Sequence, residues 1–296
     1  MSERGTGRPD NGGVSAGGTG RIAFQGEPGA FSHQACREVY PDMDPLPCAT
    51  FEAALEAVRN RDADLAMMPI ENSLYGRVAD LHHLLPDSGL YTIGEHFVPI
   101  RLQLLGLPGA SLDGITEAQT HMVALGQCRN FLRNRGIAGQ VGADTAGSAR
   151  EVKEAGLMHR AAISSALAGE IYGLEPLAAD IEDMDHNTTR FLVMSRRRIE
   201  ADPTEGQAIT SFLFEVRNVP AALYKAMGGF ATNGVNMNKL ESFMVGGSFT
   251  ATRFYAEIEG HPDDPAVERA LEELQFFCKA FKILGVFPMH RHRAPG

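Results

Sequence analysis

Short apolar segments alternate with an amphipathic helix early in the chain, and this alternation limits the folds that it can adopt. Residues 21–25 and 64–70 have the length and apolar character of strands. Between them, Thr50 predicts the N-cap of a helix over residues 51–59. Strand, helix and strand in such short succession predict a parallel α/β sheet. Ligands of such sheets bind beyond the carboxyl ends of the strands, so we expect a site there.

A second set of strands and helices follows. Residues 90–107 predict two strands, and residues 121–135 predict a helix with one apolar face. Further helices are expected at residues 148–154 and 161–172. We therefore expect two α/β lobes, with a cleft between them, over residues 21–198.

The pattern changes after a polar linker at residues 199–208. Residues 209–290 predict the order strand, helix, strand, strand, helix and strand, which is the ferredoxin-like arrangement. Tails are expected at residues 1–20 and 291–296. The first tail is rich in glycine and polar residues, so we expect it to be disordered.

Composition excludes several classes of partner. The chain has 296 residues, 44% hydrophobic and 22% charged, as two soluble domains would have. Its net charge of -10 argues against a nucleic-acid or membrane partner. The four cysteines lie far apart and no metal-binding motif is present, so we expect free thiols, no metal and no cofactor. No signal peptide or membrane span is expected, which makes a cytoplasmic location the default.

Three polar clusters follow predicted strands. The turn from Gly26 to Gly29 precedes a helix that Ser32 would cap and that ends before Pro41. Two further clusters, residues 71–73 and 187–191, flank apolar runs and carry amides, hydroxyls and one arginine. Such donors suit anion binding and the delivery of one proton to a leaving oxygen. Ordinary turns and helix caps are the alternative interpretation of each cluster.

In order and spacing, these clusters resemble the motifs of prephenate dehydratase. The similar strings are Gly26-Glu-Pro-Gly-Ala-Phe-Ser32, Pro69-Ile-Glu-Asn-Ser-Leu-Tyr-Gly76 and Asn187-Thr-Thr-Arg-Phe191, with further similarity at residues 124–128, 144–149 and 161–165. Residues 211–288 resemble the ACT regulatory domain of these enzymes. The resemblance implies an α/β fold with a two-lobed, periplasmic-binding-protein-like catalytic domain at residues 21–198 and a ferredoxin-like βαββαβ ACT domain at residues 209–290.

The resemblance implies that the chain converts prephenate to phenylpyruvate, with loss of carbon dioxide and water, in phenylalanine biosynthesis. Thr189 matches the family's catalytic threonine and would donate a hydrogen bond to the leaving hydroxyl. Threonine is a weak acid, so Glu71 is expected to assist it, and Arg190 would pair with a substrate carboxylate or form a structural salt bridge. The other residues expected to hold the substrate are Gly29, Ser32, Asn72, Ser73, Gln127, Thr145, Ser148, Asn187, Thr188 and Phe191.

The ACT resemblance implies feedback control by phenylalanine bound between paired domains, and hence a homodimer or homotetramer. Where the family commonly has Arg-Pro this chain has Phe243-Met244, and its usual Gly-Ala-Leu string begins with Ala221, so the strength and sign of the response stay open. The expected effector residues are Asn218, Ala221, Ala222, Leu223, Asn233, Gly234, Val235, Asn236, Glu241 and Ser242.

Two alternative functions follow from departures and from the domain plan. Ala30 stands in place of a usual threonine, and residues 120–123 replace a usual Ser-His-Pro-Gln string, so arogenate is an alternative substrate. Arogenate carries an amino group in place of the side-chain keto oxygen. From another class, the chain could be a non-catalytic amino-acid sensor. A fused chorismate mutase is not expected, because the segment before Arg21 is short and polar.

Overall fold

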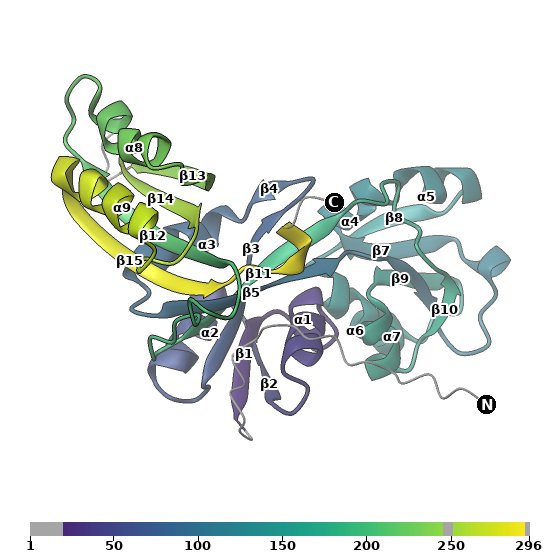
Figure 1. The fold of residues 1–296 in the computed structure, drawn as a ribbon. Coiled ribbons are helices and arrows are strands. Elements are labelled where there is room, and N and C mark those ends of the chain that lie inside the picture. Colours follow the sequence, from purple (N-terminus) through teal and green to yellow (C-terminus); the bar gives the residue numbers. More distant parts are fainter. Residues whose placement is uncertain (1–19, 245–250, 294–296) are drawn as a thin grey trace, which may run out of the picture. The chain divides into compact units, whose positions relative to one another are not determined.

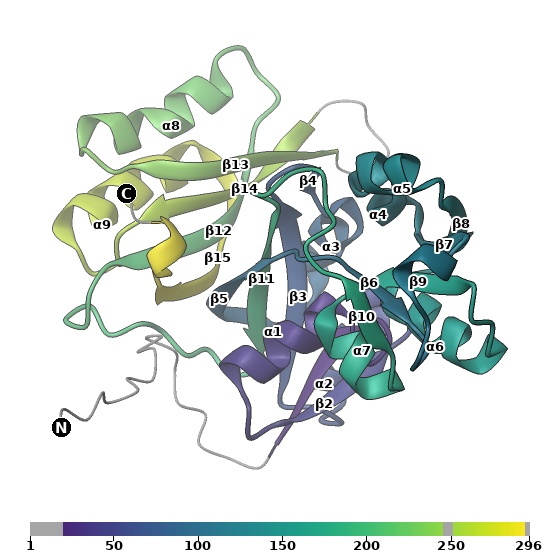
Figure 2. The ribbon, with the colours of Figure 1, turned by 90° about the vertical axis from the view of Figure 1, so that its right-hand side faces the viewer.

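The computed structural model describes residues 20–244 and 251–293, which fold into two compact units. The larger unit holds residues 20–90 and 96–196, and the smaller unit holds Tyr91–Glu95 together with the chain from Arg197 on. Each unit has its own sheet structure and its own apolar core (Figure 1, Figure 2). Within the described ranges, no helix combines the length and the apolar character that a membrane span requires.

The first lobe of the larger unit is built on a mixed sheet. Its strands, in order across the sheet, are β2 (Asp44–Cys48), β1 (Arg21–Gln25), β3 (Leu65–Asn72), β11 (Thr188–Ser195) and β5 (Tyr91–Pro99), with β4 (Gly76–Arg77) paired to β3. Strand β1 is parallel to β2 and to β3, whereas β11 is antiparallel to β3. The predicted parallel sheet is therefore confirmed for three strands, and β11 departs because the chain re-enters this lobe from the second one.

The helices of this lobe are α1 (Phe31–Val39), α2 (Phe51–Arg59), α3 (Ala79–Leu84) and the short 3-10 helix η1 (Leu85–Asp87). Of these, the sequence predicts α1 and α2 but not α3 and η1. Thr50 caps α2 as predicted, because its side chain accepts a hydrogen bond from the Ala53 N–H at 3.1 Å. Helix α1 ends before Pro41 as expected, but its N-cap is Ala30, so the prediction of Ser32 as the cap is wrong. Ser32 lies in the first turn of α1 instead.

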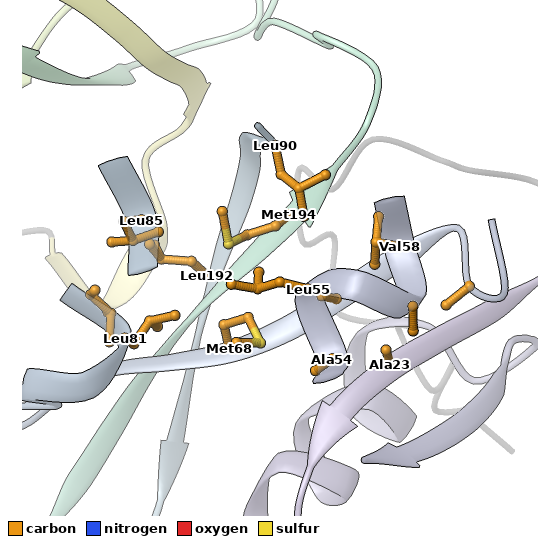
Figure 3. Packing of buried hydrophobic residues seen from close by; sticks show 14 residues of the cluster. Ala23, Ala54, Leu55, Val58, Met68, Leu81, Leu85, Leu90, Leu192 and Met194 are labelled. Carbon is orange, nitrogen blue, oxygen red and sulfur yellow. The ribbon is translucent and has the colours of Figure 1, made fainter. Parts of the chain in front are cut away.

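Apolar side chains from the helices α2, α3 and η1 and from the strands β1, β3 and β11 meet in the core of this lobe (Figure 3). Leu55 of α2, Leu81 of α3, Met68 of β3 and the β11 residues Leu192 and Met194 are each at most 1% exposed. Burying one such side chain contributes about 1.5–3 kcal/mol. The core therefore holds β11 firmly beside β3, which fixes the residues at the end where the two strands meet.

The second lobe has a similar plan. Its strands, in order across the sheet, are β10 (Glu175–Ala178), β6 (Gln103–Gly106), β9 (Arg160–Ser164), β7 (Glu117–His121) and β8 (Ala138–Gly142). Its helices are α4 (Met122–Gln127), α5 (Arg129–Arg135), α6 (Thr145–Ala155) and α7 (Ala166–Tyr172), with the short 3-10 helix η2 (Leu112–Gly114). Strand β7 is parallel to β8 and β9, and β6 is antiparallel to β9 and β10.

Two helices predicted in this lobe differ from the structure. Residues 161–164 belong to the central strand β9 (Arg160–Ser164), not to the start of a helix, because they are buried between neighbouring strands of the sheet. The predicted helix over residues 121–135 is divided at Cys128, whose backbone (φ -112°, ψ 19°) leaves the helical region. His121 is the N-cap of the first half, and its ring accepts a hydrogen bond from the Val123 N–H.

Two crossing segments join the lobes, residues 100–102 and 179–187, and they are hydrogen-bonded to each other. The Ile100 N–H donates to the Asn187 carbonyl at 2.8 Å, and the Ile181 N–H donates to the Leu102 carbonyl at 3.0 Å. The carboxylate of Glu182 accepts from the Leu102 N–H and from Arg101, and its side chain is 3% exposed. The two crossing segments therefore form an ordered, hydrogen-bonded connection between the lobes.

The smaller unit has the predicted order of elements. These are β12 (Ala208–Val216), α8 (Ala222–Thr232), β13 (Met237–Met244), β14 (Ala251–Glu259), α9 (Pro265–Phe277) and β15 (Cys278–Pro288), followed by the 3-10 helix η3 (Arg291–Arg293). The strands form one antiparallel sheet in the order β13-β14-β12-β15. Phe212 and Phe214 of β12 pack against Phe230 of α8 and Leu274 of α9. The ferredoxin-like βαββαβ arrangement is confirmed, while the turn expected at residues 245–247 lies outside the described residues.

A buried ionic cluster joins three parts of the smaller unit. The Arg293 guanidinium donates to the Glu95 carboxylate at 2.8–3.0 Å and to the Glu257 carboxylate at 2.6 Å. Both carboxylates are fully buried, and the Tyr255 hydroxyl donates to Glu257 at 2.5 Å. The sequence predicts a tail from residue 291 and a domain start at residue 209, whereas the unit includes Arg293, begins at Arg197 and recruits Tyr91–Glu95. Arg293 and Glu95 belong to the unit because the buried carboxylates of Glu95 and Glu257 need a cation, which Arg293 supplies.

Replacing Arg293 with alanine is expected to lower the free energy of unfolding by about 3–5 kcal/mol, because two buried carboxylates would lose their shared guanidinium. Urea denaturation followed by circular dichroism measures this change. Arg291→Ala, on the exposed neighbour, is the control and should leave the curve unchanged. Equal effects of the two substitutions would show that the cluster does not stabilise the unit.

Candidate active site

A cleft of about 600 Å³ lies between the two lobes of the larger unit. Its walls come from the ends of β1 and β3 and the start of β11 in the first lobe, and from the starts of α4 and α6 in the second. Aromatic side chains of Phe31, Phe51 and Phe191 line it together with Ile100 and Leu102. The cleft therefore occupies the position expected from the sequence, beyond the carboxyl ends of parallel strands.

Two helices direct their N-terminal ends into this cleft from opposite lobes. Ala30, Phe31 and Ser32 at the start of α1 line it, as do Asp144 and Thr145 at the start of α6. The first N–H groups of a helix have no partner within the helix, and the helix dipole makes this end positive. The start of α1, which no side chain caps, can therefore bind a carboxylate with the Ser32 hydroxyl beside it. At the start of α6 the Asp144 carboxylate already accepts from the Gly147 N–H at 2.7 Å.

The side-chain amide of Asn72, at the end of β3, makes four hydrogen bonds that join it to the following turn and to residues at and directly before the start of β11. The Asn72 Oδ1 accepts hydrogen bonds from the Leu74 N–H at 2.9 Å and the Tyr75 N–H at 3.0 Å. Its Nδ2 donates to Asn187 Oδ1 at 2.7 Å and to Thr189 Oγ1 at 3.0 Å. Because the Thr189 oxygen already accepts from Asn72, its own proton is free to point at a ligand in the cleft.

Glu71 and Arg190 do not belong to this cleft lining. The Arg190 guanidinium donates to the Glu71 carboxylate at 2.8 Å, its side chain is 3% exposed, and it lies over the Phe97 ring at 6.0 Å. Thr189 and Phe191, on either side of Arg190, line the cleft instead. The structure thus favours the structural salt bridge over the catalytic roles predicted for Glu71 and Arg190, because neighbouring strand residues point to opposite faces.

Four other predicted residues support the cleft from behind. The Ser73 hydroxyl donates to the His186 carbonyl and accepts from the Thr188 N–H, both at 2.9 Å, so these two residues fasten β3 to β11. The Ser148 hydroxyl donates to the Asp144 carbonyl at 2.7 Å. Gly29 packs against Ala168 of the second lobe. The catalytic candidate Thr189 lines the cleft, and so do the predicted substrate-binding residues Ser32, Asn72, Gln127, Thr145, Asn187 and Phe191.

Gly29 is needed for close packing, and both its backbone groups are already used. Its N–H donates to His33 Nδ1 at 3.0 Å, and its carbonyl accepts from the Ser165 hydroxyl. With φ at +94°, an added Cβ would lie 2.7 Å from the Ala168 Cα. Gly29 therefore makes a close contact between the lobes, while its predicted role in holding the substrate stays a prediction.

His33 is a structural histidine. Burial and the charge of Arg37 lower the pKa of the His33 ring, which stacks on Phe24 at 5.2 Å. The ring is therefore neutral near pH 7, and Nδ1 can accept the hydrogen bond that holds the Gly29 turn.

Several cleft residues were absent from the sequence-based set. Gln25 and His121 end strands β1 and β7, and Asp144 directly follows β8, so the rule about carboxyl ends of strands could have found all three. Asp80 also lines the cleft, but nothing in the sequence marks it. Among the residues that the structure describes, no arginine or lysine lines the cleft, and no cluster of three or more histidine, cysteine or acidic residues could hold a metal.

Comparison with known proteins identifies the family. A family model for prephenate dehydratase matches residues 22–199. The bifunctional N-acyl-homoserine lactone acylase/prephenate dehydratase of Komagataeibacter europaeus is 49% identical over 267 residues, covering 90% of this chain and 95% of that protein. The chloroplastic arogenate dehydratase/prephenate dehydratase 1 of Arabidopsis thaliana is 36% identical over 283 residues, covering 91% of this chain and 72% of that protein.

A solved structure agrees with these relatives. The prephenate dehydratase from Arthrobacter aurescens, in complex with L-Phe, has a TM-score of 0.83 at 32% identity and covers 93% of this chain and 92% of that chain. The chain therefore belongs to the prephenate dehydratase family, and it is an enzyme of that family. The resemblance drawn from the sequence motifs is confirmed for the dehydratase part.

Replacing Glu71 with glutamine tests its position outside the cleft. We expect kcat within about fivefold of the parent and a free energy of unfolding lower by about 1–3 kcal/mol, because Arg190 would lose its charged partner in a largely buried site. Steady-state kinetics and urea denaturation measure the two effects. Glu52→Gln, on an exposed residue of α2, is the matched control. A loss of turnover above 100-fold with unchanged stability would return Glu71 to the reaction.

Proposed function

We propose that this enzyme converts prephenate to phenylpyruvate, carbon dioxide and water. The observation that carries the proposal is the Thr189 hydroxyl, which accepts from Asn72 and so has its proton free to point into an aromatic-walled cleft. Such a hydroxyl can donate to the oxygen that leaves the ring. The reaction needs orientation and one donor more than it needs a strong base, because the product ring is aromatic.

The substrate carboxylate that the product keeps would be bound without a cation. The N-terminal end of α1 offers backbone N–H groups and the Ser32 hydroxyl, and the start of α6 on the opposite wall adds the Thr145 hydroxyl. Gln127 offers a further amide donor. Charge-assisted hydrogen bonds to backbone N–H groups can replace an arginine in this role.

The apolar walls favour the decarboxylation itself. As the bond from the ring to its carboxylate breaks, the electron pair enters the ring, the negative charge leaves the carboxylate, and the C4–O bond breaks. A carboxylate that loses charge on the way to the transition state reacts faster in surroundings that solvate it poorly. Phe31, Phe191 and Ile100 supply such surroundings in this cleft.

Arogenate is the second candidate substrate. Asp80 and Asp144 line the cleft, and a carboxylate could pair with the ammonium group that distinguishes arogenate from prephenate. The relative from Arabidopsis thaliana carries both activities in its name. The relative from Komagataeibacter europaeus is also named an N-acyl-homoserine lactone acylase, so this amide hydrolysis belongs in the same assay.

We propose further that the smaller unit is an ACT domain that binds phenylalanine between two copies of the chain, in a homodimer or homotetramer. The Arthrobacter aurescens structure is a complex with L-Phe. In this chain the residues proposed for the effector lie near opposite ends of α8, whose 11 residues span about 16 Å, so one copy does not gather them into one pocket. Asn218, Ala221, Ala222 and Leu223 lie at its start, and Asn233, Gly234, Val235 and Asn236 at its end, while Glu241 and Ser242 lie on β13.

Two details of these residues bear on the affinity for phenylalanine. Ala221 has φ at 62°, a left-handed conformation that favours glycine, so alanine is strained where the family's string has glycine. The Asn233 side chain already bonds the Gly229 carbonyl, Glu273 and Arg269. We therefore expect weaker phenylalanine binding than in relatives that keep the glycine and the Arg-Pro pair.

The deciding experiment offers purified protein prephenate, arogenate and an N-acyl-homoserine lactone in parallel, each with and without millimolar phenylalanine. Formation of phenylpyruvate far above spontaneous breakdown is expected, with inhibition by phenylalanine. Faster turnover of arogenate would make it the substrate, and homoserine lactone release would establish the second activity. No acceleration of either dehydration would leave the non-catalytic sensor. An unchanged rate and no calorimetric binding at millimolar phenylalanine would remove the effector.

Removal of the Thr189 hydroxyl is expected to lower kcat by at least about 100-fold, since a donor that acts only in the transition state is lost. Thr189→Val keeps the shape of the side chain without the hydroxyl, and Thr189→Ser keeps the hydroxyl and should stay within about tenfold of the parent. Stopped-time assays of phenylpyruvate measure both. If valine and serine variants turn over alike, the hydroxyl has no part in the reaction.

A further inference from the structure

The Asn187 amide has one hydrogen-bonding group to spare, and it lies beside Thr189. Asn187 is 3% exposed, and its side chain lines the cleft. Its Oδ1 accepts from Asn72 Nδ2 at 2.7 Å. No acceptor within residues 20–244 and 251–293 reaches its Nδ2, although that atom is buried. Buried amide donors are almost always paired, so this one indicates an acceptor that arrives with the ligand.

The orientation of this amide follows from the backbone. The Asn72 Oδ1 is fixed by the N–H groups of Leu74 and Tyr75, so its Nδ2 must face away from that turn. A donor in that position requires an oxygen opposite it, which is the Oδ1 of Asn187. The spare group of Asn187 is therefore the N–H₂, and a flipped amide would set two donors against each other.

One atom, Asn72 Nδ2, holds the Asn187 amide next to the Thr189 hydroxyl. Asn72 Nδ2 donates both to Asn187 Oδ1 and to Thr189 Oγ1, at 2.7 and 3.0 Å. The Asn187 carbonyl also accepts from the Ile100 N–H of the other crossing segment, at 2.8 Å, so the backbone of Asn187 is fixed as well. Two fixed donors beside one another can bind one oxygen between them.

We infer that Asn187 is a catalytic residue that donates its Nδ2–H to the leaving hydroxyl together with Thr189. The inference rests on the proposed dehydration. As the C4–O bond breaks, the oxygen leaves with the bonding pair as hydroxide, accepts hydrogen bonds from both donors, and takes its proton from solvent water. The two donors stabilise the developing charge in the way of an oxyanion hole, so neither needs to be a strong acid. This accounts for a site that works without Glu71.

Asn187→Asp and Asn187→Ala separate donation from positioning. The aspartate variant keeps an oxygen that accepts from Asn72 but loses the donor, whereas the alanine variant loses both groups. Donation predicts that both variants lower kcat by about 100-fold or more, with KM within about threefold. Asn134→Asp, which adds the same charge on an exposed residue of α5, should not change kcat.

Binding of phenylpyruvate, which lacks the leaving hydroxyl, controls for the fold. Its Kd in Asn187→Ala should stay within about threefold of the parent while kcat falls. An aspartate variant within fivefold of the parent, beside a slow alanine variant, would reduce Asn187 to a positioning residue for Asn72 and overturn the inference. Two variants that both turn over normally would also overturn it. A parent that dehydrates neither prephenate nor arogenate would overturn the proposed function itself.

Discussion

The four hydrogen bonds of the Asn72 amide are the interaction on which the cleft depends. Two of them bind the turn that ends β3, and two bind Asn187, directly before β11, and Thr189 of β11, which lie 115 and 117 positions later in the chain. With every donor and acceptor satisfied, the amide has one orientation only. The direction of the Thr189 proton, and the identity of the spare group on Asn187, both follow from that orientation.

The placement of charge in this enzyme is unusual for a protein that handles a dianion. Arg190 lies outside the cleft lining and pairs with Glu71. Among the described residues that line the cleft there is no arginine or lysine. The chain as a whole carries a net charge of -10. Under the proposed function, the N-terminal end of α1 and neutral hydroxyl and amide groups would therefore carry the recognition of the substrate carboxylate. Donors of this kind keep their polarity at every pH where the protein is folded.

Much of this arrangement could be predicted from the sequence. The βαββαβ order, the cap at Thr50 and the cleft at the ends of β1 and β3 all follow from local patterns. Residues 161–164 were predicted wrongly, because a short buried apolar run fits a helix and a strand equally well. The direction of Arg190 and the burial of Arg293 depend on partners far away in the chain, Glu71 and Glu95, and no local pattern encodes such pairs.

The smaller unit is not continuous in the sequence. Its cluster of Glu95, Glu257 and Arg293 takes one carboxylate from a strand more than 100 residues before Arg197. A fragment cut at the linker would retain the guanidinium and Glu257 but lose Glu95 and the strand that carries it. Exchange of this unit between members of the family, whether by recombination or in the laboratory, would therefore have to transfer Glu95, a partner of Arg293, along with the C-terminal segment.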